Sequence, residues 1–134
     1  MADQTAPSDA LRIKINRKLT GELGEKAACD YLLAADYAIL ERNWRCRSGE
    51  LDVIAELDGR FIFVEVRART AGGKFGTAAE SVDYRKQQKV RNTAQVYLKS
   101  IGRIDAPQRF DVVAVTINRL DGGIAECRHY EGAF

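Results

Sequence analysis

Two apolar runs joined by an Asp-Gly pair constrain the fold of this chain more than any other feature. The runs are ELDVIAEL and RFIFVEVRA, and only Asp58 and Gly59 separate them. β-branched and aromatic residues favour strands, and Asp-Gly is a strong signal for a two-residue hairpin turn. The pattern therefore predicts an antiparallel hairpin over residues 50–68.

The remaining elements follow from the spacing of apolar residues. Residues 17–36 and 82–101 repeat apolar positions every three or four residues, which is typical of helices. Residues 37–44, 109–117 and 124–130 read as further strands, and residues 70–79 as a glycine-containing loop. The runs FIFV and DVVAV indicate strands covered on both faces. We therefore expect an α/β fold, one domain with a mixed sheet flanked by helices.

Length and composition set the wider limits. The chain has 134 residues, which suits one domain. Its first ten residues are small and polar and predict a disordered tail, which leaves residues 11–134 as the domain. Three cysteines without C-x-x-C spacing, and no apolar run of about 18 residues, predict a cytoplasmic protein without a membrane segment. The net charge of +2 does not by itself point to nucleic acid.

The hairpin register brings two carboxylates together. If Asp58 and Gly59 form the turn, Asp52 lies directly opposite Glu65, and Glu50 lies opposite Arg67. Directly opposed strand residues have Cβ atoms about 5 Å apart, where like charges are destabilising. Such a pair should share a proton or bind a cation.

Two interpretations of the pair remain open at this point. Mg²⁺ is usually held by one or two carboxylates and water, so Asp52 and Glu65 could form a site for Mg²⁺ or Mn²⁺. Alternatively, they are a solvated acidic pair that Arg67 and Arg69 balance, with no ion.

Polar residues on both helices favour a site. Lys86 and Gln87 share the apolar arc of the second helix, and Glu25 lies on the packing side of the first. Gly21 and Gly24 would let the first helix approach the sheet closely. The ordinary alternatives are that Lys86 extends along the helix end to reach water, and that Glu25 is a favourable charge in the first helical turns.

Several motifs, in order, resemble the YraN-like family of small bacterial proteins, which is assigned to the restriction-endonuclease-like superfamily. The Asp52 and Glu65-Val66-Arg67 positions are similar to the D…(D/E)-x-K motif of that superfamily. The wider resemblance rests on GELGE at 21–25, RNWR at 42–45, GELDVI at 49–54, FVEVRAR at 63–69, RKQ at 85–87, RFDVV at 109–113 and HYEGAF at 129–134.

The resemblance implies a core of helix, three antiparallel strands, helix and strand, as in Holliday-junction resolvases. It further implies that Asp52, Glu65 and the carbonyl of Val66 hold Mg²⁺, with Glu25 in a supporting contact. Arg67 stands where the superfamily ordinarily has lysine, and an arginine cannot act as a base near neutral pH. It could still face the charge of a phosphate, with Lys86 supplying the ammonium group.

Three functions are therefore weighed, in descending order. The first is a metal-dependent endonuclease on nucleic acid, which the resemblance implies to be DNA, with Arg69 and Lys74 on backbone phosphates. The second is a non-catalytic nucleic-acid-binding protein, which Arg67 favours. The third is a structural or partner-binding domain. A homodimer would suit a resolvase, although no residue in the sequence marks an interface.

Three further residues have mainly structural interpretations. We expect Trp44 to pack against a helix rather than stack on a base. Asp111 should accept hydrogen bonds from Arg109 or nearby backbone. His129, two positions from Cys127, lacks the usual ligand spacing for zinc and is expected to be an ordinary edge residue.

Overall fold

The computed structural model describes residues 15–71 and 82–134. The predicted tail at residues 1–10, most of the predicted loop at 70–79, and Lys74 lie outside the described residues. The described elements, in chain order, are α2 (Arg17–Ala34), β1 (Ala38–Cys46), β2 (Gly49–Leu57), β3 (Arg60–Thr70), α3 (Tyr84–Ser100), β4 (Gln108–Ile117) and β5 (Ile124–Tyr130).

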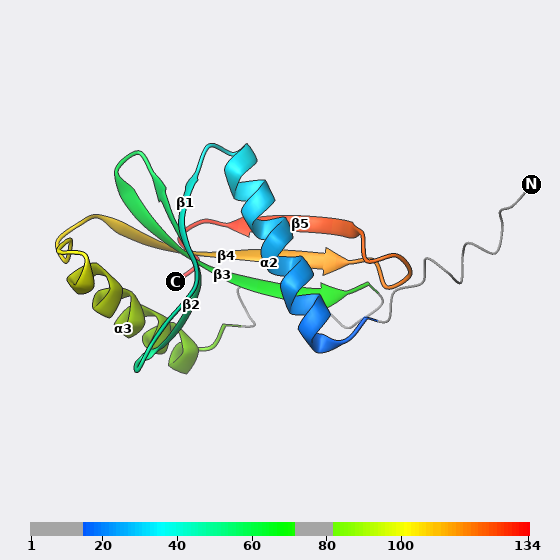
Figure 1. Cartoon of the computed structure of the whole chain (residues 1–134), viewed down its shortest axis with the longest axis horizontal. Coiled ribbons are helices and arrows are strands. Elements are labelled where there is room, and N and C mark those ends of the chain that lie inside the picture. The colour runs from blue at the N-terminus through cyan, green and yellow to red at the C-terminus, as the bar shows by residue number, and fades with distance from the viewer. Residues whose placement is uncertain (1–14, 72–81) are drawn as a thin grey trace, which may run out of the picture.

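The five strands form one mixed sheet in the order β1-β2-β3-β4-β5. Strands β3 and β4 are parallel, with α3 between them in the chain, and every other neighbouring pair is antiparallel. Figure 1 shows α2 crossing the long strands β3 and β4, with α3 beside β2. The predicted single α/β domain with a mixed sheet is confirmed.

Local sequence signals account for where the elements begin and end. Asp58 and Gly59 have φ values of 52° and 79°, as a type I′ turn requires, and the register starts at Leu57–Arg60 as predicted. The side chain of Asn16 caps α2 by accepting from the N–H of Leu19 at 2.8 Å. Asp83 caps α3 in the same way, by accepting from the N–H of Lys86 at 2.8 Å.

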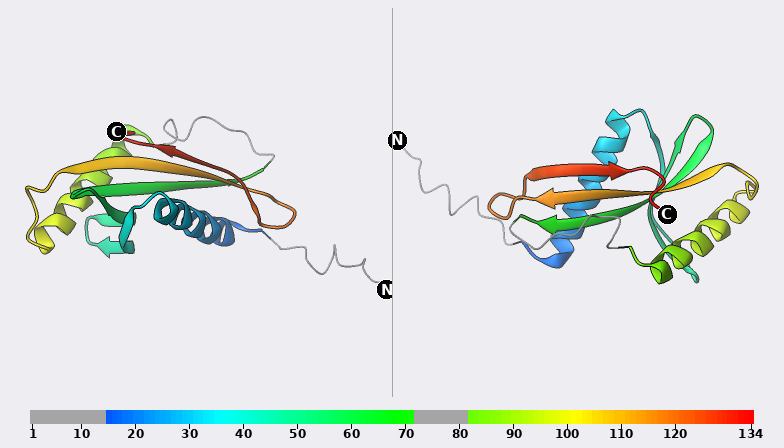
Figure 2. Two further views of the ribbon diagram at one scale, coloured as in Figure 1. Left: turned by 90° about the horizontal axis from the view of Figure 1, so that it is seen from above. Right: turned by 180° about the vertical axis from the view of Figure 1, so that it is seen from behind.

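The two faces of the sheet carry separate hydrophobic clusters, one under each helix. The left view of Figure 2 shows α2 beneath the long strands. Trp44 packs edge to face on Tyr97 of α3, with ring centroids 5.2 Å apart, which confirms its predicted contact with a helix. The α2 cluster includes Ala28, Leu32, Val53, Ile62, Val64, Val113 and Val115, and the α3 cluster includes Leu51, Ile54, Phe63, Val90, Leu98 and Phe110.

The sheet divides where β2 leaves β3. The β2–β3 register runs only from Leu57–Arg60 to Val53–Val64, whereas β3 continues along β4 as far as Thr70. On the other side of β2, Asn43 of β1 has a φ of 52°, a backbone conformation that is uncommon outside glycine. Figure 1 shows β1 and β2 turning away from the direction of β3, β4 and β5. Asp52 precedes Val53, the last paired residue of β2, and therefore lies at this fork.

Candidate metal-binding carboxylate pair

Asp52 and Glu65 meet at the fork between β2 and β3. The Asp52 carboxylate (Oδ2) accepts a hydrogen bond from the N–H of Val66 at 2.9 Å. Glu65 follows the last registered residue of β3 and is 2% exposed. The predicted proximity of the two carboxylates is thus found. The predicted pairing of Asp52 with Glu65 in the β-ladder is not found, because the register ends at Val53–Val64. The N–H of Val66 is bound by the Asp52 side chain and not by the backbone of β2.

Burial shifts the pKa values of both groups upward, and nearby carboxylates add to each shift. Loss of water, followed by the nearby charge of Asp52, raises the pKa of Glu65 to about 7. Burial also raises the pKa of Asp52, and the Val66 N–H opposes that rise. The charge of Glu25 adds to the increase at Asp52. The pair therefore resists carrying two negative charges without a cation beside it.

Lys86 supplies one positive charge to this pair. Its ammonium (Nζ) lies 3.4 Å from Glu65 Oε1, and its side chain is 43% exposed. The expectation that Lys86 faces the sheet from α3 is met. Gln87, which was assigned to the site with Lys86, donates from its amide (Nε2) to the carbonyl of Val82 at 2.9 Å. This bond holds the start of α3.

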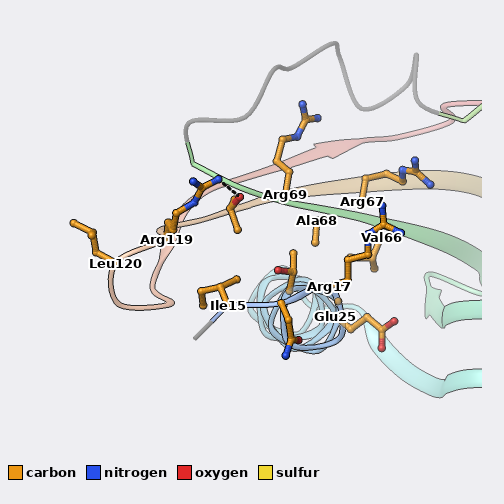
Figure 3. Close-up of a pocket in the computed structure, with 13 residues that line it drawn as sticks. Ile15, Arg17, Glu25, Val66, Arg67, Ala68, Arg69, Arg119 and Leu120 are labelled. Atoms are coloured by element: carbon orange, nitrogen blue, oxygen red, sulfur yellow. Dashed lines mark hydrogen bonds between the residues drawn. The ribbon is translucent and has the colours of Figure 1, made fainter. Parts of the chain in front are cut away.

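Glu25 approaches the pair from α2 because the helix lies very close to β3. A Cβ on the adjacent Gly24 would come 2.5 Å from the Cβ of Ala68, so only glycine allows this approach. The same expectation for Gly21 is wrong, since nothing would lie within 4 Å of its Cβ. Figure 3 shows Glu25 at the end of the pocket farthest from Leu120.

The arginines of β3 alternate with residues that pack on α2. Figure 3 shows Arg69 on the side of β3 away from α2 and Ala68 on the side toward it. Arg67 shares the face of Glu65, and its charge works to lower the Glu65 pKa. The expectation that Glu50 lies opposite Arg67 is wrong. Glu50 pairs with Arg45 of β1, whose guanidinium (Nε) lies 3.0 Å from the Glu50 carboxylate.

A second charged cluster lies on the other face of the sheet, around the fully buried Asp111. Its carboxylate accepts two bonds of 2.8 Å from Arg109, one of 2.9 Å from the N–H of Gly132, and contacts His129 Nε2 at 2.7 Å. The predicted bond with Arg109 is confirmed. His129 is not an ordinary edge residue, since its side chain is 5% exposed and its Nδ1 lies 3.1 Å from the Tyr31 hydroxyl.

The alternation of inward and outward positions along β4 could have revealed part of this cluster. Asp111 shares the alternation of Val113 and Val115, which belong to the α2 cluster. A charged residue at an inward position needs a partner. By contrast, the contact of His129 with Tyr31 and the hydrogen bond from Arg109 to the Tyr37 hydroxyl join distant parts of the chain, so no local pattern predicts them.

Two findings limit the chemistry of the described residues. No group of three or more His, Cys, Asp or Glu side chains with metal-binding geometry occurs among residues 15–71 and 82–134. Among the described residues, an ion at Asp52 and Glu65 would thus have two carboxylate ligands, with main-chain oxygen or water completing its shell. Over the same residues, no helix is long and apolar enough to cross a membrane.

The fold and the carboxylate pair define a class of small, single-domain α/β protein with one buried and one half-buried acidic group where a mixed sheet divides. The chain belongs to the family described as "Uncharacterised protein family UPF0102", whose model matches residues 24–115. The family membership expected from the sequence is confirmed. The matched range contains Glu25, Asp52, Glu65 and Lys86.

Relatives in the same family cover most of the chain. A UPF0102 protein of Caldanaerobacter subterraneus is 40% identical over 90% of this chain and 98% of its own length. One from Pelotomaculum thermopropionicum is 45% identical over 88% of this chain and 97% of its own length. One from Clostridioides difficile is 42% identical over 75% of this chain and 88% of its own length.

Proposed function

We propose that the protein is a Mg²⁺- or Mn²⁺-dependent phosphodiesterase that cuts nucleic acid, with Asp52 and Glu65 as the metal ligands. The observation that carries the proposal is that these two carboxylates lie close together, Glu65 buried and Asp52 half-buried, with the pKa of Glu65 raised to about 7. A divalent cation removes the repulsion that raises this pKa, and hard cations prefer oxygen ligands.

The order of elements supports a restriction-endonuclease-like core. That core is expected to run helix, three antiparallel strands, helix and strand, and the chain runs α2, β1, β2, β3, α3, β4. The sequence resemblance at Asp52 and at Glu65-Val66-Arg67 points the same way. Holliday-junction resolvases share this core, so branched DNA is the first substrate to try. A homodimer, and a place in the cytoplasm, remain predictions of the same resemblance and of the composition.

The donor set fits a hard divalent cation. Two carboxylates with water completing the shell are a usual arrangement for Mg²⁺. The N–H and C=O of one strand residue point to the same side, so the Val66 carbonyl faces the same edge as the N–H bound to Asp52. It is available there as a third oxygen ligand. When bound, the ion would supply Lewis acidity toward a phosphate oxygen and an attacking water.

The other charged groups of the site would act on the substrate. Lys86, 3.4 Å from Glu65, would stabilise negative charge on the phosphate that reacts. Arg67 shares this face of β3 and would do the same without exchanging protons. Glu25 would hold the Asp52 side of the site through a water molecule. Arg69 would bind a neighbouring phosphate, as was also expected of Lys74.

The second candidate is a nucleic-acid-binding protein without turnover. The specific observation in its favour is Arg67, because the superfamily ordinarily has a lysine at that position. A guanidinium stays protonated and cannot activate water as a base. This candidate keeps the metal site and predicts binding without cleavage.

The test of the metal site is a calorimetric titration of Mn²⁺ into the wild type, Asp52→Asn and Glu65→Gln. Asparagine keeps an oxygen that can accept from the Val66 N–H, so the backbone there stays supported. Asp30→Asn is the matched control, since Asp30 is an exposed carboxylate paired with Lys26 at 2.8 Å. We expect saturable binding in the wild type and the control, and at least a tenfold weaker affinity in both site variants.

Equal binding by all four proteins, or none by the wild type, would remove the metal site and the nuclease with it. If the site stands, cleavage of labelled single-stranded, flapped and four-way-junction DNA in Mn²⁺ separates the two candidates. A nuclease cuts one of these and loses the activity in Glu65→Gln. A binder without turnover retains all of them intact.

A further inference from the structure

A cleft of about 1100 Å³ runs along β3 from Val66, the residue after Glu65, to the turn between β4 and β5. Its walls come from the start of α2, the second half of β3 and that turn (Figure 3). The charged residues that line it are four arginines and a single acid, namely Arg17, Arg67, Arg69, Arg119 and Glu25. Among the described residues, the wall is therefore strongly positive.

One end of the cleft reaches the proposed metal site. Val66 and Glu25 line this end, and Val66 is the residue whose N–H binds Asp52. At the other end, Arg119 donates to the Thr70 hydroxyl at 3.2 Å, which holds its guanidinium beside β3. A ligand that lies in the cleft would thus extend from the carboxylates toward Arg119.

The edge of β3 adds main-chain donors to this wall. The N–H of Ala71 binds the carbonyl of Ile117 in β4, while the N–H of Val66 points the opposite way, to Asp52. By alternation, the N–H and C=O groups of Ala68 and Thr70 point away from β4. The β2–β3 register ends at Val53–Val64, so no described strand covers them. Backbone N–H groups are frequent partners of phosphate oxygens.

Apolar residues beside the arginines indicate which form of nucleic acid fits. Ile15 and Leu120 line the cleft, and Leu120 is 71% exposed. Positive side chains along a groove track a phosphate backbone, and apolar side chains can pack against the faces of unstacked bases. A duplex keeps its bases stacked inside and would meet only the arginines. A single strand can use both kinds of side chain.

We propose that this cleft binds a single nucleic-acid strand next to the cutting site, with Arg17 and Arg119 on its phosphates. The proposal rests on the proposed function, because it names the form of the substrate for the same site. It assigns a separate role to residues that lie outside the carboxylate site, so that binding and metal chemistry can be lost independently.

The test measures binding by fluorescence anisotropy, with EDTA present so that metal plays no part. The probes are a labelled 12-nucleotide single-stranded DNA and the blunt duplex of the same sequence. The proteins are the wild type, Arg17→Gln, Arg119→Gln, their double variant, and Arg128→Gln as the control. Arg128 is an exposed arginine of β5 that pairs with Glu126 at 2.8 Å.

We expect the single strand to bind at least tenfold more tightly than the duplex. Each variant at Arg17 or Arg119 should weaken that binding threefold to tenfold, while Arg128→Gln should leave it unchanged. In the double variant, the slope of log K against log salt should also become shallower by about 1.4. This is the change expected when two phosphate contacts with a single strand are lost. Thermal unfolding of each variant would verify that it folds.

Three results would overturn the proposal. The first is equal or tighter binding of the duplex, and the second is wild-type binding by the double variant. The third is displacement of the single strand by polyglutamate of equal charge at equal concentration, which would show binding by charge alone. The Mn²⁺ titration is independent of all three. Failure of the proposed strand binding would therefore leave the metal site unaffected, and failure of the metal site would leave the measured strand binding unaffected.

Discussion

Glu65 is a carboxyl group in a place that water barely reaches, and its titration should be visible in the stability of the protein. Its folded pKa of about 7 lies above the ordinary 4.5. Between these values the folded state therefore binds a proton that the unfolded state has released. Linkage makes this contribution to stability complete below about pH 4.5 and lost as the pH rises through 7. The raised pKa of Asp52 acts in the same direction.

Glu65→Gln should abolish most of this pH dependence. A difference of one pKa unit corresponds to about 1.4 kcal/mol, so the wild type should lose on the order of 3 kcal/mol relative to the variant between pH 5 and 8. Urea unfolding of both proteins in EDTA at pH 5, 6, 7 and 8 measures the difference. Parallel stability profiles would show that Glu65 titrates like an exposed carboxylate.

Asp111 has the opposite electrostatic character on the other face of the sheet. Burial alone would raise its pKa, but bonds from His129, Arg109 and the Gly132 N–H hold the pKa below its usual range. Because the folded pKa is lowered, the resulting stability is present above the ordinary value of 3.8 and is lost as the pH falls through the folded one.

Asp111→Asn should therefore destabilise the fold strongly at pH 7. Removing one partner of a buried charge network typically costs about 3–5 kcal/mol, because the remaining charges stay buried without compensation. The free energy of urea unfolding gives the measurement, with the exposed Asp30→Asn as the control. A loss below about 1 kcal/mol would mean that Arg109 and His129 find other partners or water.

At the scale of elements, the contact between α2 and β3 positions Glu25, and one glycine decides it. Gly24→Ala would place a methyl group 2.5 Å from the Ala68 Cβ and should cost about 1–3 kcal/mol as the helix shifts outward. Gly21→Ala in the same helix meets nothing within 4 Å and should instead stabilise by about 0.5–1 kcal/mol. Thermal and urea unfolding of both variants tests this difference in sign, which equal effects would contradict.

The elements themselves follow closely from local sequence. The Asp58-Gly59 turn fixes the hairpin and its register, since its backbone conformation depends on only two residues. The predicted strand at 124–130 matches β5 residue for residue. The end of the β2–β3 pairing could not be predicted in this way. The pairing ends where β2 leaves β3, and hydrophobic alternation contains no information about where two strands separate.

At the scale of the whole molecule, a contact could be predicted from the sequence only where its two residues lie close together along the chain. The proximity of Asp52 and Glu65 was predictable because one short hairpin joins them. The contact of His129 with Tyr31 joins residues 98 positions apart, and it exists only once α2 has packed on the sheet. The inward direction of Lys86 was predictable from its position on the helix. The hydrogen bond from the Gln87 side-chain amide to the Val82 carbonyl was not, because it depends on how the chain enters α3.

The two charged clusters also divide the molecule by role. Glu65 lies on the α3 face, whereas Asp111 lies on the opposite face, which it shares with Val113 and Val115 of the α2 cluster. Side chains without shared partners usually contribute independently to stability. The Asp111 network can therefore maintain the sheet while the carboxylate site keeps the strain of two adjacent acids, as functional sites commonly do.

The fork at which β2 leaves β3 also bears on how such a protein can diverge. Asp52 is constrained twice, because its carboxylate both contributes to the acidic pair and accepts from a backbone N–H that no described strand covers. A lineage that lost the reaction would still need an acceptor at this position, and aspartate or asparagine would persist there. Among the described residues, the partner of Glu65 is the half-exposed ammonium of Lys86 rather than a backbone N–H, so its replacement by an uncharged residue would relieve the fold. An intact Glu65 is therefore the better record of an ancestor that used the site.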